Sequence, residues 1–233
     1  MSPFPRRFFV SRPCAGVFHV QFAPRPGLLG EVDLAFHFLR FQEHYESPGF
    51  KGRVFTWAQY VAWYRAVRGV FSYPWDWDGY NFPGHILEPF RNGDFDPLTQ
   101  RERALLEALN GVGPSDYVIG TWTGDPAAVD HELAHACWAL DRGYQDRVRA
   151  VLAGGDYGKQ RDALGAGEAY DPEVFLDEIQ ACGVEGYEDY APDEGRRGLI
   201  REAFHESLER LKADRAGGRP SIPSSCETSC FKS

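Results

Sequence analysis

The residues with the clearest chemistry in this chain form one HExxH pattern, made of His131, Glu132 and His135. Two histidines four residues apart on an α-helix lie on one face about one turn apart, so both imidazoles can reach a single Zn²⁺. Glu132 projects roughly a quarter turn away, where a carboxylate can take a proton from a metal-bound water without being a ligand. The pattern therefore predicts a zinc hydrolase site in which Glu132 is the general base.

A helix must position these residues, and the flanking sequence predicts one over residues 126–140. Asp125 and Pro126 supply an N-cap and a proline at the first helical position. Gly143 follows shortly after this segment and is expected to end the helix. Apolar residues recur within the segment at helical spacing and predict a buried face: Val129, Leu133, Ala136, Cys137 and Leu140.

A catalytic zinc usually has three protein ligands and one open position, so a third ligand is expected downstream of the pattern. Glu178 is the preferred candidate, because the Asp-Pro pair at 171–172 and a run of apolar residues at helical spacing predict a second helix over residues 172–182. This helix would turn Glu178 inward. Four alternatives stay open at this point: Asp177, Glu168, Glu173 and His205.

An HExxH helix followed by a ligand glutamate from a separate helix resembles the gluzincin branch of zinc metallopeptidases, the thermolysin-like enzymes. The resemblance covers residues 117–182 and implies a zincin-like domain. In that domain His131, His135 and Glu178 bind zinc and Glu132 activates water. The resemblance also implies that residues 117–121 form the edge strand along which an extended substrate lies.

The chain departs from the gluzincin pattern four residues after Glu178. These enzymes place an aspartate there to orient a metal histidine, whereas this sequence has Cys182. The orienting role is therefore expected to fall on Asp177, Asp130 or Gln180. A hydrolase also needs a group that stabilises the oxyanion, and the candidates downstream of the helix are Tyr170, Tyr187, Tyr190 and His205.

The N-terminal half supplies the rest of the predicted fold. Alternating residues predict strands over 8–10 and 17–22 as an antiparallel pair, and helical spacing predicts helices over 34–45, 57–67 and 99–109. We interpret the aromatic segment 73–85 as a loop that packs in the core or forms a wall of the substrate cleft. Within it, Asp76, Asp78 and His85 are a weaker alternative metal site. The predicted class is an α+β, mostly helical zincin-like domain with a small antiparallel sheet over residues 1–212, followed by a flexible tail over 213–233.

Composition restricts the partners and the compartment. The net charge of −9 and the absence of Lys/Arg blocks argue against nucleic acids and anionic membranes as partners. No apolar run approaches the roughly 18 residues needed to span a bilayer, and residues 1–10 do not resemble a signal peptide. Five cysteines form no disulfide framework; Cys137 and Cys182 are expected in the core, and Cys226 and Cys230 in the tail.

These observations favour a cytoplasmic zinc metallopeptidase that acts on a peptide or protein. The alternative is a catalytically inert zincin-like fold that holds a structural metal or binds a partner through the aromatic segment. The two hypotheses differ in one feature, because a hydrolase keeps a coordination position open for water beside Glu132.

Overall fold

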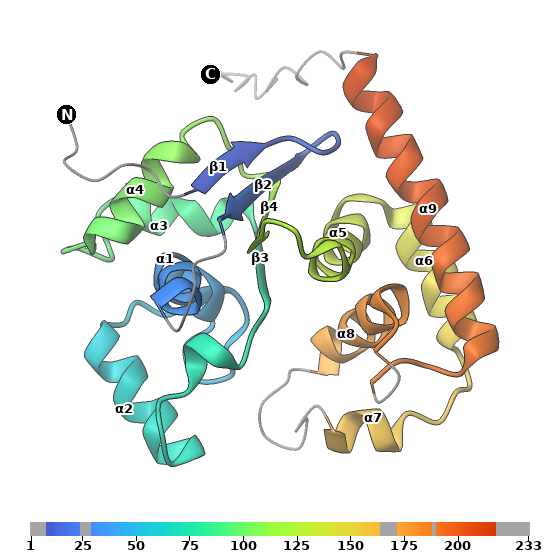
Figure 1. Ribbon diagram of the computed structural model, residues 1–233, viewed down its shortest axis with the longest axis horizontal. Helices are drawn as coiled ribbons and strands as arrows, with labels where there is room; N and C mark the ends of the chain where they lie inside the picture. The colour runs from blue at the N-terminus through green and yellow to red at the C-terminus, as the bar shows by residue number, and fades with distance from the viewer. Residues whose placement is uncertain (1–7, 24–28, 164–171, 188–189, 218–233) are drawn as a thin grey trace, which may run out of the picture.

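The protein combines nine α-helices with a four-stranded sheet in the part of the chain that the computed structural model describes, residues 8–23, 29–163, 172–187 and 190–217 (Figure 1). This confirms the predicted α+β class. The strands are β1 (Phe8–Ser11), β2 (Val17–Phe22), β3 (Gly79–Pro83) and β4 (Tyr117–Trp122). The helices are α1 (Leu29–Glu46), α2 (Trp57–Arg68), α3 (Glu88–Arg91), α4 (Gln100–Ala108), α5 (Pro126–Leu140), α6 (Arg142–Leu152), α7 (Gly158–Ala163), α8 (Pro172–Glu185) and α9 (Glu194–Ala216). Two 3₁₀ turns, η1 (Tyr73–Trp75) and η2 (Gly84–Leu87), flank β3.

The strands lie in the order β1-β2-β4-β3. The predicted antiparallel pair of β1 and β2 is confirmed, but the sheet as a whole is mixed, because β4 returns parallel to β2 after the long helical connection between them. The prediction of an edge strand at residues 117–121 is wrong, since β4 lies between β2 and β3. The edge strand beside β4 is β3, which pairs antiparallel with β4.

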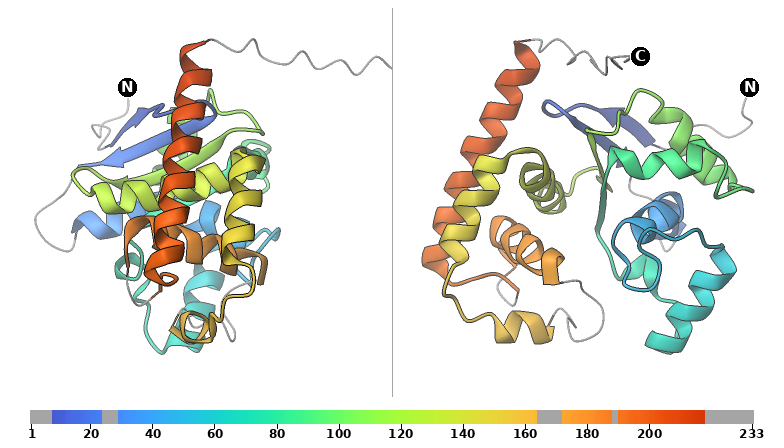
Figure 2. Two further views of the ribbon diagram at one scale, coloured as in Figure 1. Left: turned by 90° about the vertical axis from the view of Figure 1, so that its right-hand side faces the viewer. Right: turned by 180° about the vertical axis from the view of Figure 1, so that it is seen from behind.

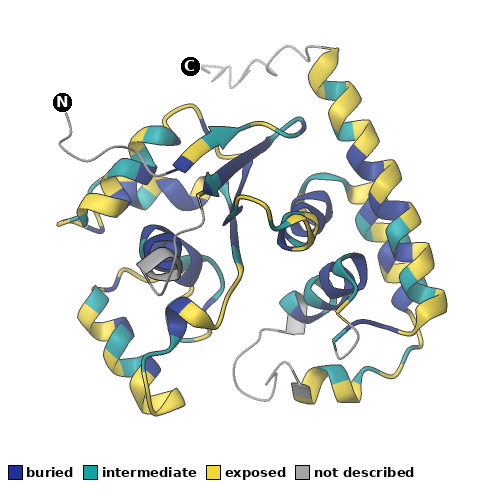
Figure 3. Ribbon diagram, viewed as in Figure 1, coloured by how far each residue is buried: buried dark blue, intermediate teal, exposed yellow. Residues whose placement is uncertain are grey.

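The sheet has a helical layer on each side (Figures 1 and 2). Side chains alternate along β4, so Val118 packs into the aromatic core around α1 whereas Tyr117 and Ile119 pack into the core around α5. Gly120 allows α1 to approach closely, because a Cβ there would lie 2.4 Å from the ring of Phe38. The second layer is formed by α5, α6, α8 and α9, whose buried residues face the sheet or one another (Figure 3).

The five predicted helices are present as α1, α2, α4, α5 and α8, with boundaries that agree or differ by a few residues. The helix around the HExxH pattern covers the predicted range, Pro126–Leu140. Gly143 does not end it: Asp141 follows α5 and caps the next helix by accepting a hydrogen bond from the N–H of Tyr144, so Gly143 lies inside α6. Two further corrections concern the aromatic segment, which contains β3, and the expected tail from residue 213, whose first residues continue α9 to Ala216.

Four residues named in the sequence analysis lie outside the described part of the chain: Glu168, Tyr170, Cys226 and Cys230. The thiols of Cys137 and Cys182 are buried and free, as expected, and so is that of Cys14. No helix within the described ranges combines the length and the apolar character needed to cross a membrane.

Candidate metal centre

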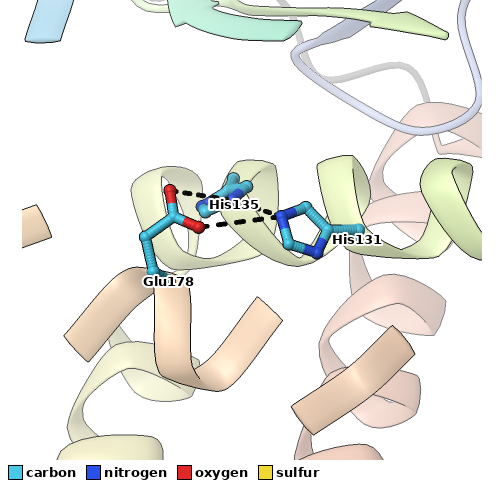
Figure 4. Close-up of side chains that lie close together, drawn as sticks. All are labelled: His131, His135 and Glu178. Atoms are coloured by element: carbon cyan, nitrogen blue, oxygen red, sulfur yellow. Dashed lines mark hydrogen bonds and ion pairs between the residues drawn. The ribbon is translucent and has the colours of Figure 1, made fainter. Parts of the chain in front are cut away.

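The two histidines of the pattern and Glu178 meet at the contact between α5 and α8 (Figure 4). Nε2 of His131 lies 3.1 Å from Nε2 of His135. The carboxylate of Glu178 extends from α8 toward both rings, with Oε2 3.9 Å from Nε2 of His131 and Oε1 3.7 Å from Nε2 of His135. Three ligand atoms of the kinds that bind Zn²⁺ therefore converge on one point.

The opposite nitrogen of each imidazole is held by a second carboxylate. Nδ1 of His135 lies 2.9 Å from Oδ1 of Asp177, and Nδ1 of His131 lies 2.9 Å from Oε2 of Glu185. A carboxylate at Nδ1 keeps the proton on that nitrogen and leaves Nε2 with a lone pair, which is the arrangement found behind metal-binding histidines. The geometry thus turns both Nε2 atoms toward the space beside Glu178.

Asp177 is in turn held by a hydrogen-bond chain. Nε2 of Gln180 donates to Oδ1 of Asp177 over 2.9 Å, and the hydroxyl of Tyr144 donates to Oε1 of Gln180. Asp177 and Gln180 were both predicted as possible substitutes for the missing aspartate, and both contribute to this arrangement. Asp130, the third candidate, is exposed on α5 and has no such contact among the described residues.

Electrostatics at the histidines is dominated by the surrounding carboxylates. Burial alone lowers the pKa of His135, but Asp177, Glu178 and Glu132 outweigh it and raise that pKa well above its ordinary value. For His131 burial is likewise opposed, chiefly by the hydrogen bond to Glu185, and its pKa is raised. A site this rich in negative charge favours a cation between the two rings.

Glu132 is buried beside this group without being part of it. Its Oε2 accepts a hydrogen bond of 2.8 Å from Nδ2 of Asn81, a residue of the edge strand β3. Burial raises the pKa of Glu132, while His131, His135 and Asn81 oppose the rise. A carboxylate whose pKa is moved toward neutrality and that lies next to a candidate metal centre fits the role of a general base.

A cleft of about 360 Å³ opens onto these residues. Its walls include His131, Glu132 and Glu178 together with side chains from the β3 region, the end of α8 and the segment after it: Trp77, Asp78, Cys182, Glu185, Tyr187 and Tyr190. The cleft therefore gives a small molecule or a peptide segment access to the space between the candidate ligands and Glu132.

The other predicted site residues take different places. Asp177 contacts Nδ1 of His135 and does not join the three ligand atoms, whereas His205 is exposed on α9. Glu173 lies in α8, and its side chain is outside the described part of the structure. Tyr187 and Tyr190 line the cleft and stay candidates for oxyanion stabilisation.

The alternative metal site in the aromatic segment does not form among the described residues. Asp76 accepts hydrogen bonds from the hydroxyls of Tyr64 and Ser72, Asp78 lines the cleft, and His85 is exposed.

Three residues that contact the histidines or Glu132 of the site were not identified from the sequence: Glu185, Asn81 and Gly79. Glu185 follows Glu178 by seven residues, a spacing that returns to the same helix face. Its position on the face of α8 that contacts His131 could therefore have been predicted from the sequence. The sequence contains no signal for Asn81 or Gly79, because their contacts with Glu132 join residues about fifty positions apart.

Comparison with protein-family models, curated proteins and solved structures found no match to this chain. The interpretation of the site therefore depends on its geometry.

Proposed function

We propose that this protein is a zinc-dependent hydrolase of amide bonds, a metallopeptidase with a gluzincin-like ligand set. The observation that carries the proposal is the convergence of Nε2 of His131, Nε2 of His135 and the carboxylate of Glu178, with the buried Glu132 beside them but outside the group. Among the described residues the group has three members, which is the number that leaves a tetrahedral zinc one open position.

Each residue has a defined part in the proposed reaction. His131, His135 and Glu178 would hold Zn²⁺, which when bound lowers the pKa of a water and polarises the substrate carbonyl. Glu132 accepts the proton of the attacking water and returns it to the leaving amine. Asp177 and Glu185 keep the two imidazoles in the tautomer and orientation that point Nε2 inward.

The surroundings of the site support a peptide as substrate. The cleft is bordered by the region of β3, the strand at the edge of the sheet, and is lined by aromatic and acidic side chains that can contact an extended chain. The buried free thiols of Cys14, Cys137 and Cys182 support a reducing compartment, so we propose a cytoplasmic location.

The test begins with the metal. The purified protein should bind about one zinc per chain, measured by elemental analysis after dialysis. His131→Ala and Glu178→Gln should each weaken that binding by about ten-fold or more, because each removes a ligand atom. Normal zinc binding in both variants would place any metal elsewhere.

Activity is then sought with a peptide library. We expect the zinc-loaded parent to cleave library members and Glu132→Gln to bind zinc equally well but to lose turnover by about 10² to 10⁴, the contribution usual for a general base. A matched control is Asp130→Asn, which removes an exposed carboxylate from the same helix and should leave turnover unchanged. A parent that binds zinc but cleaves nothing, with a fourth protein side chain on the metal in a zinc-bound structure, would favour the inert zincin-like alternative.

A further inference from the structure

The carboxylate of Glu132 is the end of a hydrogen-bond chain that starts on the sheet. The hydroxyl of Tyr117 donates to Oδ1 of Asn81 over 2.6 Å, and Nδ2 of Asn81 donates to Oε2 of Glu132 over 2.8 Å. An amide side chain has one acceptor side and one donor side, so the hydroxyl on Oδ1 determines that the NH₂ group faces Glu132. All three side chains are buried, which protects both hydrogen bonds from competition by water.

The backbone of Asn81 is also held in place. Its N–H donates to Oε1 of Gln42 on α1 over 2.8 Å, and in the ladder Asn81 pairs with Ile119 of β4. The outward side of the edge strand is therefore bound to α1 at this residue. Asn81 has little freedom to move away from Glu132.

Gly79 completes the contact between β3 and Glu132. It lies two residues before Asn81 and so on the same face of the strand. A Cβ at this position would lie 2.2 Å from Oε1 of Glu132, which means that Oε1 occupies the space above the glycine. One strand thus locates both oxygens of the carboxylate, with Oε2 on the Asn81 amide and Oε1 over Gly79.

We infer that Asn81 is a positioning residue for the proposed hydrolysis: it binds Oε2 of Glu132 and thereby directs Oε1 to the water that attacks the substrate. The inference rests on the proposed function. An unanchored glutamate samples several rotamers, and only some of them put an oxygen within reach of the reacting water. A neutral amide suits this role because it donates a hydrogen bond without exchanging a proton with the base.

The first test uses Co²⁺ as a spectroscopic probe metal and acetohydroxamic acid as a probe ligand. Acetohydroxamic acid binds a metal ion as its anion, through both of its oxygen atoms. The proton that its O–H group loses passes to an adjacent carboxylate, which is here the carboxylate of Glu132. Asn81→Leu removes the amide at nearly equal volume, and Asn81→Asp keeps the acceptor for Tyr117 while replacing the donor. We expect both variants to bind Co²⁺ at least as tightly as the parent. We expect them to bind the hydroxamate about ten-fold more weakly, because Glu132 is no longer held in the rotamer that accepts this proton.

The control is Thr121→Val, which removes a buried hydroxyl from the same sheet whose partner is His19. Its hydroxamate affinity should equal that of the parent. Circular dichroism and thermal unfolding establish that each variant is folded.

The second test combines the variants with Glu132→Gln. If Asn81 acts through Glu132, Asn81→Leu should have no further effect on hydroxamate affinity once Glu132 has been replaced. With a peptide from the library screen, Asn81→Leu should lower kcat by about ten-fold or more and change KM by less than about two-fold. A general disturbance of the fold would instead act equally in both backgrounds and would also change KM.

The outcomes separate this inference from the proposed function. A parent that binds Co²⁺ and hydroxamate, with both Asn81 variants equal to it, overturns the positioning role alone. An Asn81→Leu effect that persists undiminished with Glu132→Gln overturns it as well. A parent that binds neither probe overturns the proposed function, and the inference falls with it.

Discussion

At the scale of single residues, the candidate site is defined by which nitrogen of each histidine is available. Both Nδ1 atoms are 2.9 Å from a carboxylate oxygen, and both Nε2 atoms face Glu178. In the proposed metal centre Asp177 and Glu185, on either side of Glu178 in α8, would take the role that the gluzincins give to one aspartate. Cys182, which occupies the aspartate position, contributes a buried thiol to the cleft wall instead.

Asp177→Asn and Glu185→Gln test this division of roles. Each variant keeps the shape of the side chain but replaces the carboxylate that contacts Nδ1 of one histidine, of His135 for Asp177 and of His131 for Glu185. Each should therefore reduce zinc affinity by about 10- to 100-fold, the range for residues that contact metal ligands. Competition with a chelating dye measures the affinity. Asp130→Asn, on the same helix as the histidines but exposed, should bind zinc like the parent. Unchanged affinity in both the Asp177 and the Glu185 variant would show that the histidines keep their orientation without these carboxylates.

At the scale of elements, α5, α8 and β3 assemble the site. The helix α5 supplies the two histidines and Glu132, α8 supplies Glu178 with the carboxylates of Asp177 and Glu185, and β3 covers Glu132 from the other side. Because β3 lies at the edge of the sheet and is also bound by Gln42 of α1, it joins Glu132 to the N-terminal core. The position of the proposed general base therefore depends on packing between two parts of the chain that are distant in sequence.

Gly79→Ala is the sharpest test at this scale. The added Cβ would lie 2.2 Å from Oε1 of Glu132, so the carboxylate or the strand must shift, at a cost of about 1–3 kcal/mol in the free energy of unfolding. Zinc binding should persist while turnover falls. Urea unfolding, zinc content and peptide cleavage measure the three effects. Gly111→Ala is the matched control, because a Cβ at Gly111 meets nothing within 4 Å, and a loss of activity in both variants alike would contradict the argument.

At the scale of the whole molecule, the aromatic core on the α1 side encloses the carboxylate of Glu43 as well as rings. Burial raises the pKa of Glu43 to about 7, although the nearby hydroxyl groups of Tyr73, Tyr60 and Ser47 oppose the rise. On the same helix, the half-buried Glu46 lies outside that core near Glu178, and burial together with the charge of Glu178 raises its pKa to about 8. These two groups are protonated in the folded protein at pH values where they would be ionised in the unfolded chain, so they make stability depend on pH.

The sign of this dependence follows from the raised pKa of Glu43. The folded state binds the proton more tightly than the unfolded state, so the contribution of Glu43 is fully present below about pH 4.5 and is lost as the pH rises through about 7. Glu43→Gln carries no ionisable group and should gain roughly 3 kcal/mol relative to the parent between pH 4.5 and pH 8. Urea unfolding at several pH values measures the difference. Glu209→Gln, on the exposed side of α9, should keep the pH profile of the parent, and parallel profiles for Glu43→Gln would contradict the prediction.

The sequence alone was sufficient for features that depend on neighbours along the chain. Caps, prolines and helical spacing predicted α5 with its observed ends, and alternation predicted β2. The Asp-Pro start of α8 led to Glu178, which the structure brings together with His131 and His135. These signals are readable because backbone propensity and side-chain periodicity act over a few residues.

Only the tertiary structure decided which residues meet across the fold. The sequence did not distinguish Asp177 as an orienting residue from Asp177 as a ligand, did not show that an edge strand lies within the aromatic segment, and did not connect Asn81 with Glu132. The contacts between α5, α8 and β3 join positions about forty residues apart or more, and burial of both cores fixes these elements together. Such contacts produce no periodic pattern in the sequence, because they depend on how whole helices and strands pack together and not on neighbouring residues along the chain.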